Sequence, residues 1–195
     1  MVLFSLRELF DIVLMTLFVG YIFSGAWKRH RPHEHNYDPL EYYRKMKFGM
    51  DWHDLKFSML VTAPAIIVHE LLHKFIAMGF GMQAEFHAAY GWLMLGLILK
   101  LMNFGFIFFV PAYVSISGNG TALQFALTAF AGPFANLVLW LIPAFLLKQH
   151  AVPRKYVPLA VLTSRINMFL FIFNMLPIPG FDGSKVFGAL LEIFF

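Results

Sequence analysis

Two histidines, His69 and His73, stand four residues apart with Glu70 directly after the first, in the pattern H-E-x-x-H. Residues four apart share one face of a helix, so both imidazoles can bind one Zn²⁺. Glu70 would then lie beside the open coordination position, where a carboxylate can move a proton. The combination predicts the chemistry of a metal-dependent hydrolase. The less specific alternative is a pair of hydrogen-bonded helix histidines with a Glu partner.

A catalytic zinc needs a third protein ligand, and few acids lie in apolar surroundings. Glu8 and Asp11 are near a chain end, and Glu192 has no broken helix beside it. Asp182 instead follows a stretch with two prolines and a glycine, 177–181, where exposed backbone must line a cavity inside the protein. We therefore predict Asp182 as the third ligand and one zinc ion as the cofactor. An iron site with the same ligand types stays an alternative.

Two asparagines in apolar segments are further candidates, and we predict both as substrate-binding residues. Asn174 precedes Asp182, and its amide could donate a hydrogen bond to a substrate carbonyl. Capping of frayed carbonyls beside Pro177 is an equally open role for Asn174. Asn136 ends the segment Ala-Gly-Pro-Phe-Ala-Asn, 131–136, where helix contact is as good an explanation as a site role.

Composition indicates a membrane protein. Of 195 residues, 59% are hydrophobic, 18% aromatic and only 13% charged, whereas soluble domains carry about 25% charged residues. We predict a multi-pass integral protein of the cell membrane, with the lipid bilayer as a partner. The chain has no cysteine, which excludes a disulfide framework, thiolate ligands and a cysteine nucleophile.

The positive charge gathers in one polar loop, 28–56. Seven of the fifteen Lys/Arg and five of the eleven Asp/Glu lie there, and such mixed charge favours lipid headgroups over nucleic acid. No nucleic-acid partner is therefore predicted. His30, His33 and His35 could chelate a metal, although a solvated loop is the simpler interpretation. Residues 42–48 are typical of an interfacial helix or turn.

The whole chain, 1–195, is predicted as one all-α membrane domain, a bundle of about five to six transmembrane helices. A capping box at Ser5 and Glu8 begins the first apolar run, for which a cleaved signal peptide is the alternative. Lys74 is expected to snorkel or to pair with an acid such as Glu85. The clear runs are 5–27, 57–80, 123–147, 157–176 and the shorter 184–195.

Residues 92–116 are apolar but interrupted. They contain Lys100, Asn103 and Pro111, and the tract 106–110 is rich in strand-forming residues. A re-entrant or β-rich segment, half helix and half strand, fits these interruptions at least as well as a straight helix does.

Three motifs now stand in a fixed order: H-E-L-L-H at 69–73, A-G-P-F-A-N at 131–136, and N-M-L-P-I-P-G-F-D-G at 174–183. Together they resemble the site-2 protease family of intramembrane zinc metalloproteases, most closely its small prokaryotic and archaeal members without a PDZ domain. The similarity runs from about residue 5 to Lys185. Phe181 stands where a leucine usually precedes the Asp-Gly pair, a hydrophobic exchange that should not disturb ligation.

The resemblance implies zinc held by His69, His73 and Asp182, with Glu70 as the catalytic base and Asn174 as a substrate-binding or oxyanion residue. It also implies a β-rich re-entrant segment after the H-E-x-x-H helix. The expected activity is hydrolysis of peptide bonds within or near the transmembrane segments of other membrane proteins.

Two other functions stay open, and so does the orientation in the membrane. Broken helices with His and Asp at the midplane also describe a transporter or metal-ion carrier. A non-catalytic, zinc-stabilised membrane protein is the second alternative. The resemblance places the loop 28–56 outside the cell, whereas its Lys/Arg content would place it inside; we follow the resemblance. The sequence makes no prediction of oligomeric state.

Overall fold

The computed structural model describes residues 3–26, 52–104 and 110–194. Most of the polar loop 28–56 therefore lies outside the described residues, and with it the possible chelating histidines, the interfacial segment 42–48 and the question of orientation. Most of the strand-forming tract 106–110 lies outside them as well.

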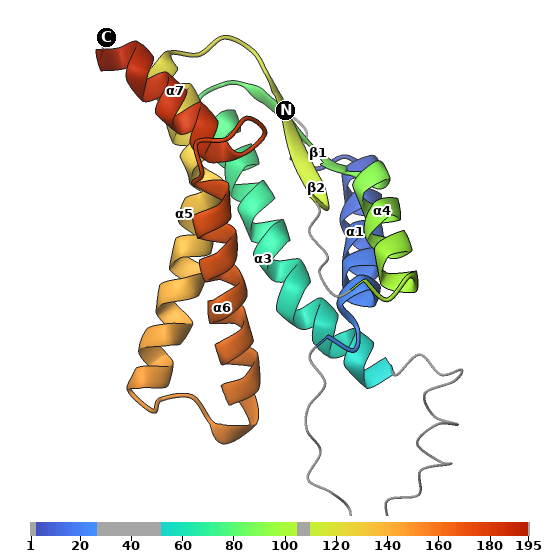
Figure 1. The fold of residues 1–195 in the computed structure, drawn as a ribbon. Coiled ribbons are helices and arrows are strands. Elements are labelled where there is room, and N and C mark those ends of the chain that lie inside the picture. The colour runs from blue at the N-terminus through green and yellow to red at the C-terminus, as the bar shows by residue number, and fades with distance from the viewer. Residues whose placement is uncertain (1–2, 27–51, 105–109, 195) are drawn as a thin grey trace, which may run out of the picture.

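Helix α3 forms the middle of the molecule, with two groups of elements on its two sides (Figure 1). Helices α1 and α4 lie on one side, and the helical hairpin of α5 and α6 lies on the other. The last helix, α7, packs against α5. The predicted all-α bundle is confirmed. The helices are α1 (Leu6–Phe23), α3 (Trp52–Gly79), α4 (Tyr90–Leu101), α5 (Ala122–Lys148), α6 (Val157–Asn174), which follows the short helix η1 (Arg154–Tyr156), and α7 (Asp182–Phe194).

Three helical segments in the described part of the chain are long and apolar enough to cross a membrane. They are Trp52–Gly79 with 28 residues, Ala122–Lys148 with 27 and Arg154–Asn174 with 21. At about 1.5 Å per residue each reaches roughly the 30 Å of a hydrocarbon core or more. The prediction of about five to six spans also counted the runs that form α1, α4 and α7. Of these, α1 includes three charged residues, and α4 and α7 have 12 and 13 residues.

A small antiparallel sheet follows α3. It pairs β1 (Gln83–Ala88) with β2 (Ala112–Ser117), in a register that runs from Gln83 opposite Ser117 to Ala88 opposite Ala112. Helix α4 connects the two strands and, at about 18 Å, is too short to cross a bilayer. The predicted order of helix and then strand in residues 92–116 is thus found as α4 and β2, although β2 begins at Ala112, later than the tract 106–110.

Helix α1 is joined to the sheet by an apolar core and by two carboxylates. The backbone N–H of Phe86 donates to Glu8 Oε1 at 2.8 Å, and that of Ala88 donates to Asp11 Oδ2 at 3.1 Å. The edge of β1 that faces away from β2 is therefore bound to α1. The buried core between α1, α4 and the sheet consists of Met15, Val19, Ile22, Phe86, Ala88, Leu93 and Ala112.

Candidate metal centre and its pocket

His69 and His73 project from the same face of α3, one turn apart. Their ring centroids are 4.7 Å apart with an interplanar angle of 81°, and their Nε2 atoms are 3.1 Å apart. Both residues are buried, with 6% of each exposed. The i, i+4 spacing thus brings two imidazole nitrogens to one point inside the bundle.

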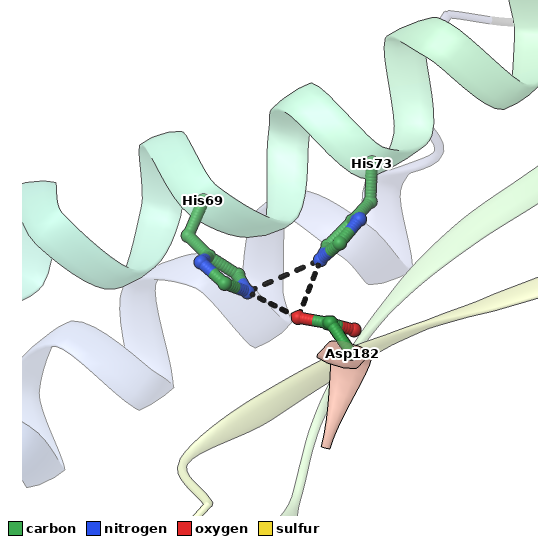
Figure 2. A group of neighbouring side chains, drawn as sticks. All are labelled: His69, His73 and Asp182. Carbon is green, nitrogen blue, oxygen red and sulfur yellow. Dashed lines mark hydrogen bonds and ion pairs between the residues drawn. The ribbon is translucent and has the colours of Figure 1, made fainter. Parts of the chain in front are cut away.

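Asp182 reaches the same point from a segment more than a hundred residues later. Its Oδ2 lies 3.1 Å from His69 Nε2 and 3.2 Å from His73 Nε2, and the three side chains point toward one another (Figure 2). The chain turns sharply between α6 and α7, where Gly180 has a φ of +100°, a value that favours glycine. Asp182 is the first residue of α7, where the helix dipole favours a carboxylate.

The donor set fits zinc. Ligands about 2.0 to 2.1 Å from a tetrahedral Zn²⁺ stand about 3.3 Å from one another. The three donor atoms of His69, His73 and Asp182 have spacings of 3.1, 3.1 and 3.2 Å. Two imidazoles and one carboxylate are a ligand set that zinc accepts, and three protein ligands leave a fourth position for water or substrate.

The outer nitrogen of each imidazole also has a partner. His69 Nδ1 lies 2.5 Å from Asn136 Oδ1, and His73 Nδ1 lies 2.7 Å from the backbone carbonyl oxygen of Thr128. Both partners are acceptors, so with zinc on the Nε2 side each Nδ1 would carry the hydrogen and each Nε2 would present its lone pair inward. Helix α5 supplies both acceptors and thereby orients the two histidines of α3.

Asn136, which we predicted to bind substrate, is engaged by protein groups on every side. The residue is 0% exposed, its oxygen contacts His69, and its Nδ2 donates to Ala65 O at 3.1 Å and to Asn167 Oδ1 at 2.8 Å. An amide with one oxygen and two N–H groups has little left to offer a substrate. The structure places Asn136 behind the metal centre, where it holds His69.

A cavity of about 70 Å³ opens beside His69. Glu70 and Asn174 both line it, as does His69, so the predicted base and the predicted substrate-binding amide face the same space. Part of the wall is the segment that leads into β2. The lining residues are Ile66, His69, Glu70, Val110, Pro111, Ala112, Leu170, Phe173, Asn174 and Phe181.

Lys74 was expected to snorkel or to pair with an acid such as Glu85, and it does pair with an acid, although not with Glu85. It forms an ion pair with Glu8 of α1, and the two side chains are only 1% and 3% exposed. Glu85 is instead 48% exposed at its side chain and lies 3.9 Å from His87. The reason is that α1 packs directly against α3, which brings a residue near the chain start next to the H-E-x-x-H motif.

Several buried polar contacts around the site were missed in the sequence. Glu8 and Asp11 were set aside as acids near a chain end, yet both are buried and bind β1. Tyr90 also donates to Asp11. The available signal was two acids in an otherwise apolar run, which require partners because an unpaired buried charge is costly. Gly132, which lies against the two histidines, belongs to the motif 131–136, whose small residues indicate close helix contact but not which residues they would contact.

An H-E-x-x-H helix whose imidazoles converge with a third ligand, beside a glutamate that faces a cavity, is the arrangement of a zinc metalloprotease. A Methanocaldococcus jannaschii protein named "Putative zinc metalloprotease MJ0611" is 33% identical over 184 residues, which cover 94% of this chain and 84% of that protein. "Putative zinc metalloprotease YwhC" of Bacillus subtilis is 28% identical over 162 residues, 70% of each chain. Neither a protein-family model nor a solved structure gives a match. The chain belongs to the zinc metalloprotease family that includes the Methanocaldococcus jannaschii protein.

Proposed function

We propose that this protein is an intramembrane zinc metalloprotease of the site-2 protease type, a multi-pass protein of the cell membrane. Its substrates would be other membrane proteins, cut within or near a transmembrane segment. One observation carries the proposal: Glu70, His69 and Asn174 line one cavity, and the helix that bears the first two is long and apolar enough to cross a membrane.

The residues of the site can take separate roles in peptide hydrolysis. When bound to His69, His73 and Asp182, zinc would lower the pKa of a water molecule and polarise the substrate carbonyl. Glu70 takes the proton of the attacking water as its oxygen bonds to the carbonyl carbon. As the C–N bond breaks, Glu70 delivers that proton to the leaving nitrogen. Asn174 donates an amide N–H to the carbonyl oxygen as negative charge develops there.

The substrate would have to unwind before it is cut, because a helix shields its own peptide bonds. The cavity is small, and the segment Val110 to Ala112 that leads into β2 forms part of its wall. Within the described residues the sheet has two strands, so no third strand pairs with the edge of β2 opposite β1. An extended substrate segment could lie along this edge with its backbone near Glu70.

The test is cleavage of a tagged single-span membrane peptide by the purified, zinc-loaded protein in lipid. Wild type should give a new terminus within or next to the apolar segment, and hydrolysis in H₂¹⁸O should place one ¹⁸O in the new carboxylate. Glu70→Gln should retain zinc and lose about 10²- to 10⁴-fold in rate. The matched control is Glu85→Gln, which changes an exposed glutamate outside the cavity and should cut normally.

Two results would contradict the proposal. Cleavage by Glu70→Gln at the wild-type rate would remove Glu70 from the mechanism. The wild-type protein could also fold and retain zinc but cut none of a panel of single-span membrane peptides. That result would favour the carrier or the zinc-stabilised structural protein, because neither needs a base beside its metal ligands.

A further inference from the structure

Two asparagines from different helices meet in the interior behind His69. Asn136 comes from α5 and Asn167 from α6, and both are 0% exposed. A polar amide in apolar surroundings costs free energy unless its hydrogen-bonding groups are satisfied. Both amides therefore need hydrogen-bond partners inside the protein.

Asn136 sits between one donor and two acceptors. Its oxygen faces His69 Nδ1, while its Nδ2 faces the Ala65 carbonyl oxygen at 3.1 Å and Asn167 Oδ1 at 2.8 Å. If the amide were flipped, its oxygen would face two acceptor oxygens, and its N–H₂ group would face the imidazole. The two acceptors thus hold the Asn136 oxygen toward His69.

Asn167 is itself oriented by its own helix. Its Nδ2 donates to the Thr163 carbonyl oxygen, one turn earlier on α6, at 2.7 Å, which leaves Oδ1 directed at Asn136. A chain of hydrogen bonds therefore runs from α6 through α5 to a histidine of α3. His73 needs no such chain because its acceptor is the backbone carbonyl of Thr128, which cannot exchange an oxygen for a donor.

We infer that Asn167 is a positioning residue for the metal centre, which fixes the tautomer of His69 through Asn136. With Oδ1 of Asn136 as an obligatory acceptor, the hydrogen of His69 stays on Nδ1 and the Nε2 lone pair stays directed at zinc. Asn167 touches neither the metal position nor the cavity. Its effect is transmitted by the direction of the Asn136 amide.

The inference rests on the metal centre of the proposed protease, and its test measures zinc binding and histidine tautomers rather than cleavage. Asn167→Leu keeps the branched shape of the side chain, although it is larger, and cannot accept from Asn136. We expect its zinc affinity, measured by chelator competition, to fall by roughly 10-fold or more. In the zinc-loaded protein with ¹⁵N-labelled histidine, where zinc rather than Asp182 would face Nε2, wild type should show His69 with its hydrogen on Nδ1, and Asn167→Leu should show a second population with the hydrogen on Nε2.

Two further variants separate positioning from general damage. Asn167→Asp keeps an acceptor oxygen in either protonation state, so it should retain both the zinc affinity and the tautomer. Ser164→Ala removes a buried hydrogen bond between the same two helices, from Ser164 Oγ to the Trp140 carbonyl oxygen at 3.1 Å. It should leave both readouts at wild-type values.

The inference is overturned if Asn167→Leu keeps the wild-type zinc affinity and tautomer, or if Ser164→Ala loses as much zinc as Asn167→Leu does. Should Asn167→Leu not fold, Asn167→Val takes its place, since it is smaller and equally unable to accept. Because none of these readouts requires a substrate, the inference can fail while the proposed protease activity stands, and the reverse is also true.

Discussion

Gly132 of α5 lies directly against His73 of α3. A β-carbon added to Gly132 would stand 2.2 Å from His73 Nε2 and 2.6 Å from His69 Nε2, far inside any real contact distance. Only a residue without a side chain lets α5 come this close to the metal-binding face of α3. The same closeness places Thr128 and Asn136 of α5 within hydrogen-bonding distance of the two histidines.

Gly132→Ala should therefore abolish stoichiometric zinc binding. In an ordinary helix this exchange stabilises by about 0.5 to 1 kcal/mol, so a loss would come from the clash with the two imidazoles. Gly188→Ala on α7 is the matched control, because its added β-carbon meets no atom within 4 Å. Zinc per protein and the thermal midpoint measure both variants. A Gly132→Ala protein with a full complement of zinc would contradict this geometry.

Asp182→Asn should weaken zinc binding by on the order of 100-fold or more, since it keeps the shape of the side chain but removes the negative charge of a direct metal ligand. Glu192→Gln removes a charge from the exposed side of the same helix and should bind zinc like wild type. The measurement is zinc content after a graded chelator challenge. Equal retention by the two variants would mean that another residue is the third ligand.

Glu8→Gln should destabilise the fold by about 3 to 5 kcal/mol, because it leaves the Lys74 ammonium buried without a counter-charge. The pair is nearly inaccessible to solvent. Replacing both partners, as Glu8→Gln with Lys74→Met, should recover a large part of the loss. Glu85→Gln, at a half-exposed glutamate, should change stability little. Denaturant midpoints in detergent test all three, and a loss in Glu85→Gln as large as in Glu8→Gln would contradict the observed pairing.

Local spacing was enough to predict part of the fold and of the site. The i, i+4 period placed His69 and His73 on one face, and the structure brings their Nε2 atoms to one point. Apolar run lengths predicted the helical bundle, and the capping box at Ser5 and Glu8 is present. Asp182 was reached by elimination, because a carboxylate after a broken apolar helix needs a cation nearby.

The contacts of Asn136, Glu8 and Lys74 could not be predicted from local spacing. Each depends on a partner on another helix, such as Lys74 with Glu8, 66 residues away. No local period encodes such a pair, and the sequence analysis named Glu85 as an example of an acidic partner. The contacts of Asn136 likewise come from other helices, α3 and α6, and they engage both its oxygen and its Nδ2.

The sequence by itself determined which residues can carry the chemistry, because side-chain type and helical period are local properties of the chain. Only the tertiary structure decided how those residues are held. The direction of each imidazole, the clearance at Gly132 and the counter-charge of Lys74 all depend on how closely α1, α5 and α6 approach α3, a distance set by the contacts of whole helices rather than by any short motif.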